Sequence, residues 1–220
     1  MKMGNTVGSL SANFCDFPKT TEDYYILGLW CADGYHWSSS IGLSNIDTAL
    51  VERFKQFLLK LFDPERIKLH IHRTGKRKHL GYQLYVNSRP LRKIFMDFRA
   101  KEERSILGNQ NICAYFAGRF DGDGCIDASL TRDCRISYGN QKDAILDYNL
   151  LKKLGFEMIR VYRYKTSNTY VIYISRFETG MFVDFLSQHS SKLQKLALRS
   201  RRDFGHVVEH DQDTKLINSV

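Results

Sequence analysis

Apolar residues recur along the chain at two spacings, one typical of helices and the other of strands. Residues 47–62 carry apolar side chains every three or four positions, which predicts an amphipathic helix that ends before Pro64. Its apolar positions are Leu50, Phe54, Phe57, Leu58 and Leu61. Residues 66–72 alternate position by position, and the strand-like runs 66–73 and 80–87 predict two strands joined by a turn around Gly75–Lys78.

The same patterns supply the other elements of the first hundred residues. Thr20 or Thr21, followed by acidic residues, can cap a helix that carries Tyr24–Cys31. Short serine- and aromatic-rich segments between 35 and 45 predict a β-hairpin. A further helix is expected near 90–98.

The second part of the chain repeats this order of elements. We expect a helix over 110–121, a hairpin over 125–139, a helix over 142–154 that Gly155 ends, strands over 158–165 and 169–175, and a helix over 177–187. A last helix, about 191–202, is rich in lysine and arginine. These elements predict an α+β fold.

Two pairs of matching segments indicate an internal duplication. ILGLWCADG (26–34) and FAGRFDGDG (116–124) stand 90 residues apart, and SRPLRKIFMDF (88–98) and SRFETGMFVDF (175–185) stand 87 apart. We therefore expect four parts, which are an N-terminal extension over 1–19, a first half over 20–104, a second half over 105–202 and a C-terminal tail over 203–220.

Composition narrows the classes of protein and of partner. Hydrophobic residues make up 43% of the chain, enough for a packed core. A net charge of +9 favours a polyanionic partner, nucleic acid first and an anionic membrane surface second. The sequence has no run approaching the roughly 18 apolar residues of a membrane span and no secretory signal, so an intracellular protein is expected, in an organelle or a prokaryotic cytoplasm.

The five cysteines are odd in number and form no CxxC pair. This pattern argues against a disulfide framework or a zinc ribbon and favours reduced thiols in the core.

The duplicated nine-residue motif places small residues and an acid on each of two helices. Gly28 and Ala32 share one helix face, as do Gly118 and Gly122, and small residues four positions apart let two helix backbones approach closely. Two such helices can pack about a pseudo-twofold axis.

Asp33 and Asp123 would then emerge side by side at one end of this helix pair. Two carboxylates at two helix C-termini repel each other, and a shared Mg²⁺, or Mn²⁺ in its place, relieves that repulsion. The carbonyls of Ala32 and Gly122 can add ligands. Such a centre suits metal-assisted phosphodiester hydrolysis.

Two other interpretations of the motif are weaker. Gly34 and Gly124 can be ordinary helix caps, but two such motifs at a fixed repeat beside basic strands favour a site. An EF-hand is excluded because Ile126 stands at its glycine position and Arg132 at its final glutamate position.

A basic surface accompanies the motif. In 66–72 the alternation places Ile67, Leu69 and Ile71 against a core and basic side chains on the opposite face, and no acidic residue occurs between 66 and 96. Such a ribbon fits the major groove of double-stranded DNA. The candidate DNA-binding residues are Ser40, Ser44, Asn45, Arg66, Lys68, His70, His72, Arg73, Lys76, Arg77, Lys78 and Gln83 in the first half, and Arg135, Asn140, Arg160, Arg163 and Lys165 in the second.

These features resemble the LAGLIDADG homing endonuclease family in its monomeric, two-motif form. The matching positions are Gly28, Ala32, Asp33, Gly34, Ala117, Gly118, Asp121, Asp123 and Gly124, and the similar layout covers about residues 20–202. The resemblance implies two tandem αββαββα halves packed about a pseudo-twofold axis, with a saddle-shaped β-surface in the major groove.

The resemblance also implies an activity. Asp33 and Asp123 would bind divalent metals, with Mg²⁺ or Mn²⁺ supporting cleavage and Ca²⁺ supporting only binding. Both strands of a long, non-palindromic target would be cut across the minor groove, leaving short 3′ overhangs, by an intron-encoded enzyme. A basic residue near the last helix of each half assists in this family. Lys192 is the candidate in the second half, and Lys101 or Arg104 in the first.

The sequence departs from the family pattern in the first motif. Cys31 replaces the first aspartate, which Asp121 retains, and Trp30 is bulky for its place. We therefore expect asymmetric packing and different half-sites.

Two other functions use the same fold. One is an RNA maturase that binds its host intron RNA, and the other is a catalytically silent DNA-binding regulator. Retention of both Asp33 and Asp123 favours cleavage.

Overall fold

The structure, a computed structural model, describes residues 17–74, 79–104, 106–126 and 134–196. The first half contains α1 (Thr21–Asp33), β1 (Gly34–Trp37), β2 (Ser40–Asn45), α2 (Thr48–Leu59), a short 3₁₀ turn (Pro64–Arg66), β3 (Ile67–Thr74), β4 (His79–Asn87) and α3 (Arg89–Ala100). The second contains α4 (Asn109–Asp123), β5 (Gly124–Ile126), β6 (Cys134–Tyr138), α5 (Gln141–Lys153), β7 (Ile159–Tyr164), β8 (Thr169–Ile174) and α6 (Arg176–Ser187). A last helix begins at Ser191 and is described to residue 196. The predicted α+β class and the order of elements are confirmed.

Matching caps begin the helices of both halves. Ser88 caps α3 and Ser175 caps α6, each with a side chain that accepts a backbone N–H of the first turn. Asp47 and Asn140 do the same for α2 and α5. Thr20 forms the predicted capping box of α1 with Asp23. Local sequence therefore sets where these helices start.

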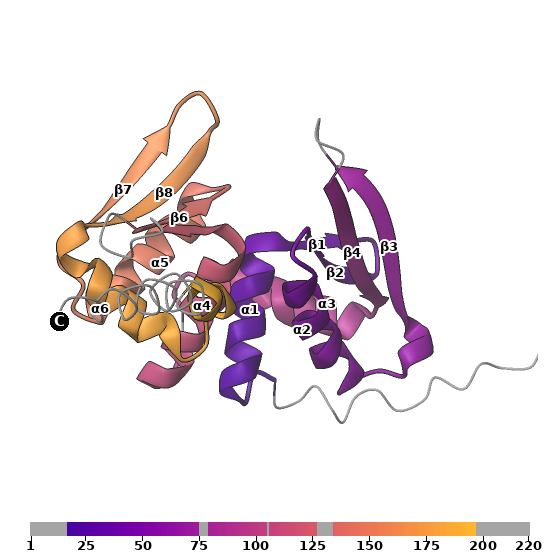
Figure 1. Cartoon of the computed structure of the whole chain (residues 1–220). Helices are drawn as coiled ribbons and strands as arrows, with labels where there is room; N and C mark the ends of the chain where they lie inside the picture. The colour runs from indigo at the N-terminus through magenta and orange to yellow at the C-terminus, as the bar shows by residue number, and fades with distance from the viewer. Residues whose placement is uncertain (1–16, 75–78, 105, 127–133, 197–220) are drawn as a thin grey trace, which may run out of the picture.

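Each half forms one four-stranded antiparallel sheet, with the order β1-β2-β4-β3 in the first and β5-β6-β8-β7 in the second. The helices lie against one face of each sheet, where Ile41, Leu43 and Leu84 are buried, as are Ile136 and Ile172. The β3–β4 and β7–β8 ribbons project to the same side at opposite ends of the molecule, with α1 and α4 between them (Figure 1). This arrangement forms the predicted saddle.

The centre of the molecule is the contact between α1 and α4. Every residue of α1 from Tyr25 to Cys31 is buried, and so is every residue of α4 from Ile112 to Asp121. A Cβ on Gly28 would overlap the carbonyl oxygen of Tyr115, and one on Gly118 would lie 2.6 Å from the amide nitrogen of Leu29. The two helix backbones thus touch directly, as the small residues of the motif predicted.

The contact continues to the ends of both helices. A Cβ on Gly122 would overlap the side chain of Ala32 and lie 2.7 Å from a carboxylate oxygen of Asp33. Gly34 and Gly124 follow the helices with extended backbones and not with the left-handed conformation of a glycine cap. Each leads directly into a strand, so the acids stand where helix meets sheet.

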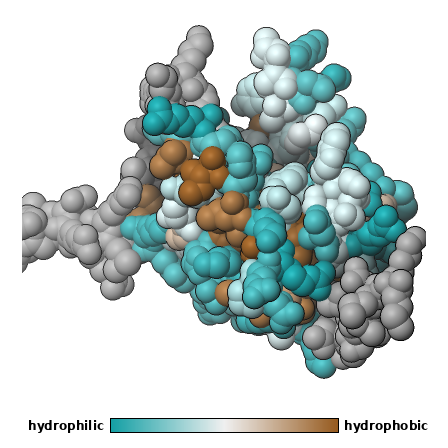
Figure 2. Space-filling model, turned by 90° about the vertical axis from the view of Figure 1, so that its right-hand side faces the viewer, coloured by the Kyte–Doolittle hydropathy of each residue, from teal (hydrophilic) through white to brown (hydrophobic). Residues whose placement is uncertain are grey.

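One prediction about the β3 strand is wrong. Leu69 and Ile71 lie on the helix-side face, as alternation required, but they are 53% and 52% exposed. β3 is an edge strand, and its outer part projects beyond the helices with Leu80 of β4, which is also exposed. Apolar residues are visible on the side of the molecule where β3 lies (Figure 2).

Cys15 lies outside the described residues, and the four described cysteines follow expectation with one exception. Cys31, Cys113 and Cys134 are buried free thiols, whereas Cys125 is free but exposed. In the described part of the chain, no helix has the length and apolarity needed to cross a membrane.

The α1–α4 contact predicts the effect of single methyl groups. Gly118→Ala should lower the free energy of unfolding by at least about 1–3 kcal/mol, because the backbones must separate. Gly180→Ala in α6 is the matched control, since nothing lies within 4 Å of its added Cβ, and it should raise stability by up to about 1 kcal/mol. Urea unfolding of both variants is the measurement, and equal changes would contradict the close contact.

Candidate metal centre and basic sheet faces

The two motif acids lie together between the sheets. Asp33 is the last residue of α1 and Asp123 the last of α4, and both are partly buried. Asn45, at the end of β2, donates its side-chain N–H to Asp33 Oδ2 over 2.7 Å. This hydrogen bond fixes the orientation of one carboxylate.

The surroundings of the two acids raise the pKa values of both carboxyl groups. Burial and the charge of Asp123 raise the pKa of Asp33 to about 6, although the hydrogen bond from Asn45 opposes the rise. Burial also raises the pKa of Asp123, and the positive charges of Arg119, Lys192 and Arg99 oppose it. Two partly desolvated carboxylates at one place favour a bound cation.

The ligand chemistry fits Mg²⁺. No group of three or more histidine, cysteine or acidic side chains that could hold a metal occurs among the described residues. Mg²⁺ is commonly held by one or two carboxylates, with waters and substrate phosphates completing its shell. The carbonyls of Ala32 and Gly122 belong to the last turns of α1 and α4, where carbonyls lack intrahelical donors, and can contribute.

Lys192 stands beside this centre, as the sequence predicted. Its Nζ donates to the carbonyl oxygens of Gly124 at 2.7 Å and Phe120 at 3.0 Å. Burial lowers the pKa of this lysine, and the carboxylates of Asp121, Asp33 and Asp123 counteract the change. The second half thus supplies a fixed positive charge next to Asp123.

Asp121 holds the segment that carries Lys192. Its carboxylate is 2% exposed and accepts the backbone N–H groups of Ser191 at 2.7 Å and Lys192 at 3.2 Å, at the start of the last helix. The hydroxyl of Ser190 also donates to it, and Tyr25 of α1 donates across the pseudo-twofold interface at 2.6 Å. Asp121 is therefore an N-cap supplied by a distant helix.

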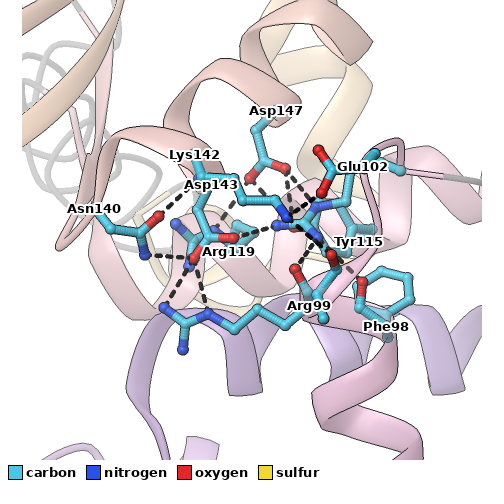
Figure 3. A network of polar contacts seen from close by, with 11 residues as sticks. Phe98, Arg99, Glu102, Tyr115, Arg119, Asn140, Lys142, Asp143 and Asp147 are labelled. Carbon is cyan, nitrogen blue, oxygen red and sulfur yellow. Dashed lines mark hydrogen bonds and ion pairs between the residues drawn. The ribbon is translucent and has the colours of Figure 1, made fainter.

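The first motif has Cys31 at the position equivalent to Asp121, and a different network of hydrogen bonds and ion pairs lies in that region (Figure 3). Tyr115, the counterpart of Tyr25, donates to Asp147 of α5 at 3.0 Å. Arg104 bonds to Asp143 at 2.5 Å and to Asp147 at 3.2 Å, and Arg119 forms a 3.4 Å ion pair with Asp147. The linker between the halves is thereby fixed to the second half.

The two candidates for the first-half assisting residue, Lys101 and Arg104, lie in different surroundings. Arg104 is buried in that network, so it is not the basic counterpart of Lys192. Lys101 is exposed just after α3.

Arg99 is a residue near the acids that no sequence pattern indicates. It pairs with Asp143 at 2.8 Å, and its charge acts on Asp123. The 87-residue offset of α3 and α6 aligns Lys192 with Ser105, so the sequence itself places no lysine or arginine at the equivalent position.

The first sheet has an open face, turned away from the helices. Register places Lys68, His70 and His72 of β3 on this face, opposite Tyr85, Gln83 and Gly81 of β4. Ser44 pairs with Gln83 on the same face. The rings of His70 and His72 stack at 5.7 Å.

The register of the second sheet shows which of its basic side chains lie on the open face, a point that the sequence left undecided. Arg135 and Arg160 lie on the open face, in register with Tyr173. Arg163 lies on the opposite face, over the ring of Tyr170 and bonded to Asn168. Lys165 is exposed in the turn between β7 and β8.

Several candidate DNA-binding residues lie elsewhere than the open faces. Asn45 contacts Asp33, and Asn140 caps α5. Ser40 shares the register of the open face but is buried at the start of β2 and donates to the Trp37 carbonyl. Arg66 donates to the Asn87 carbonyl before β3 begins. Arg73 pairs with Leu80 on the helix-side face. Lys76, Arg77 and Lys78 lie outside the described residues.

Comparison with known proteins agrees with this geometry. Residues 20–97 match the LAGLIDADG-like domain family. No curated protein sequence matches the chain.

Solved structures share the fold over most of the chain. Variants of the homing endonuclease I-DmoI match with 21% identity and a TM-score of 0.55, covering 76% of this chain and 96% of theirs. I-DmoI in complex with DNA and Mn matches with 19% identity and a TM-score of 0.56 over 76% and 96%. The N-terminal LAGLIDADG domain of DUF199/WhiA matches with 15% identity and a TM-score of 0.59 over 85% and 91%.

Full-length DUF199/WhiA from Thermatoga maritima matches with 17% identity and a TM-score of 0.55, covering 92% of this chain and 64% of that one. At these identities the likeness establishes the fold. Residues 20–97 match the LAGLIDADG-like domain family and residues 109–196 repeat the same order of elements, so the chain has the LAGLIDADG fold.

Proposed function

We propose that the protein is a site-specific homing endonuclease that makes a double-strand break in a long, non-palindromic DNA target. The observation that carries the proposal is the pair of partly buried acids, Asp33 and Asp123, set between two basic sheet faces. We further propose that it acts as a monomer with Mg²⁺ and leaves short 3′ overhangs. I-DmoI structures have been solved with target DNA and Mn, Mg or Ca, which supports a divalent-metal nuclease.

The residues divide the chemistry between the two strands. Asp33 and Asp123 would hold Mg²⁺, which supplies an activated water and neutralises charge on the phosphate. Asn45 orients the Asp33 carboxylate, and Lys192 places a positive charge beside Asp123. Each acid ends its own helix, so each half serves one scissile phosphate.

A DNA-binding regulator without cleavage is the second candidate, because WhiA, which has a similar fold, is a DNA-binding regulator. A regulator needs no metal-binding acids. In this chain both acids are retained and their pKa values are raised by burial, a cost that a bound cation offsets. That feature favours the nuclease.

Removing either acid should separate cleavage from binding. In Mg²⁺, the wild-type protein should cut a plasmid that carries the uninterrupted allele of its host gene once, with staggered ends. Asp33→Asn and Asp123→Asn should each lower cleavage at least a hundredfold while the Kd for this DNA, measured in Ca²⁺, changes less than about threefold, since the open sheet faces are intact. Binding by the wild-type protein without any cut would favour the regulator.

Protons should compete with the cation for Asp33. Because the pKa of this acid is raised to about 6, affinity for Ca²⁺ should be constant above that pH and fall by up to about tenfold per pH unit below it. Asn45→Ala removes a hydrogen bond that lowers the pKa, so the fall should begin at higher pH. Calorimetric titration between pH 5 and 8 measures this. Ser44→Ala, on the open face of the same strand, is the control that should leave the profile unchanged.

Asp121 should act on cleavage through Lys192. Asp121→Asn weakens the cap at Ser191, so we expect about 1–3 kcal/mol lower stability and at least tenfold slower cleavage, with Ca²⁺ affinity retained. The double variant with Lys192→Met should cut no more slowly than Lys192→Met alone. Tyr25→Phe is the control, because it removes another hydrogen bond to Asp121 but keeps the carboxylate that caps the helix at Ser191. Multiplicative losses in the double variant would show that the two residues act independently.

A further inference from the structure

The two sheets share one register, which makes their open faces comparable position by position. Gly34 pairs with Leu43 in the first sheet as Gly124 pairs with Ile136 in the second. One row across the first open face therefore consists of Tyr35, Gly42, Tyr85 and Lys68. The equivalent row of the second consists of Cys125, Arg135, Tyr173 and Arg160.

The edge strand is basic in both rows. Lys68 on β3 and Arg160 on β7 are exposed and occupy equivalent positions at the outer edges of their sheets. Lys68 and Arg160 share a positive charge, but only Arg160 has a planar guanidinium that can make two parallel hydrogen bonds. A position at which either residue serves is suited to a contact with DNA phosphate, which requires only the charge.

The inner strand differs sharply between the rows. In the first sheet, a Cβ on Gly42 would lie 2.8 Å from Cζ of Tyr35 and 2.8 Å from Cβ of Tyr85. The Tyr35 ring thus covers this position, and burial together with the charge of Tyr85 raises the pKa of Tyr35 to about 12. Apart from Lys68 on β3, the first row thus presents tyrosine side chains from β1 and β4 and no cation.

In the second sheet the short side chain of Cys125 replaces Tyr35, and Arg135 takes the place of Gly42. Arg135 is exposed on β6, which has a strand on each side. No carboxylate among the described residues forms an ion pair with Arg135 or Arg160. A guanidinium at the centre of an open face is placed for base edges, and arginine binds O6 and N7 of guanine through two hydrogen bonds.

We infer that Arg135 is the specificity-determining residue of the second half-site and selects a guanine there. The symmetry-related step of the first half-site is read by tyrosines and carries little preference, while Lys68 and Arg160 bind phosphates. The inference rests on the proposed function. Arg135 pairs with Cys125, two residues beyond Asp123. Strand dimensions and the reach of the side chain thus place the guanine within roughly five base-pair steps of the scissile phosphate.

The test uses the full chain and Ca²⁺. DNA that binds is selected from a random duplex library, and Kd is then measured for the selected site with each base pair substituted. Wild-type protein should prefer guanine about 5-fold to 150-fold at one position of one half-site, and less than about threefold at the symmetry-related position. Arg135→Lys, which keeps the charge, should reduce the guanine preference to about threefold or less.

Matched variants separate base reading from phosphate binding. Arg135→Gln should change the preferred base from guanine to adenine, which glutamine binds through two hydrogen bonds. Arg160→Lys should leave the preference unchanged, and Arg160→Ala should weaken all sites equally and reduce the salt slope by about one. Arg163→Lys, on the opposite face of β7, should change neither.

Two failures are distinguishable. If the wild-type protein selects and cuts a defined site but Arg135→Lys keeps the full preference, or Arg160→Lys loses it, the assignment to Arg135 is wrong and the proposed function stands. If the wild-type protein selects no site, the proposed function fails, and the inference fails with it.

Discussion

The direct contact between the α1 and α4 backbones is the constraint on which the rest of the structure depends. A side chain at Gly28 or Gly118 would fill space that the opposite helix backbone occupies. Because the helices meet this closely, Asp33 and Asp123 end side by side, and their desolvation follows. The placement of the two acids is thus produced by packing in the core, at glycines that themselves carry no functional group.

The polar framework around this contact is asymmetric although the fold is duplicated. In the second half Asp121 caps the last helix and binds Tyr25 across the interface. The first motif has Cys31 at the equivalent place, and Tyr115 finds its acceptor in Asp147 of α5 instead. When positions are counted from the matching caps Asp47 and Asn140, α2 has the apolar residues Leu50 and Phe54 where α5 has Asp143 and Asp147. One duplicated frame therefore supports two different buried networks.

Much of this could be predicted from the sequence because its signals are local. The caps and the hydrophobic patterns depend on neighbouring residues, and they located every α-helix and strand of the described chain to within a few positions. The pairing of Asp33 with Asp123 followed from small residues four positions apart. Exposure of Leu69 and Ile71 did not follow, because alternation identifies the face of a strand and not how far the covering helices extend.

The unpredicted site residues share a physical reason. Asn45 was assigned to the DNA face and Arg99 was not assigned at all, because each acts through an element that only the tertiary fold brings to the acids.

The separation of the open sheet faces from the helix contact explains which positions can vary. Residues on the open faces contact no core, so Gly42 and Arg135 can differ at equivalent positions while the helix contact stays fixed. The exception is Gly42 itself, because a Cβ there would also overlap the backbone oxygen of Leu84. Recognition in the first half is therefore constrained by the sheet that displays it, and only the second half is free to carry a long side chain at this position.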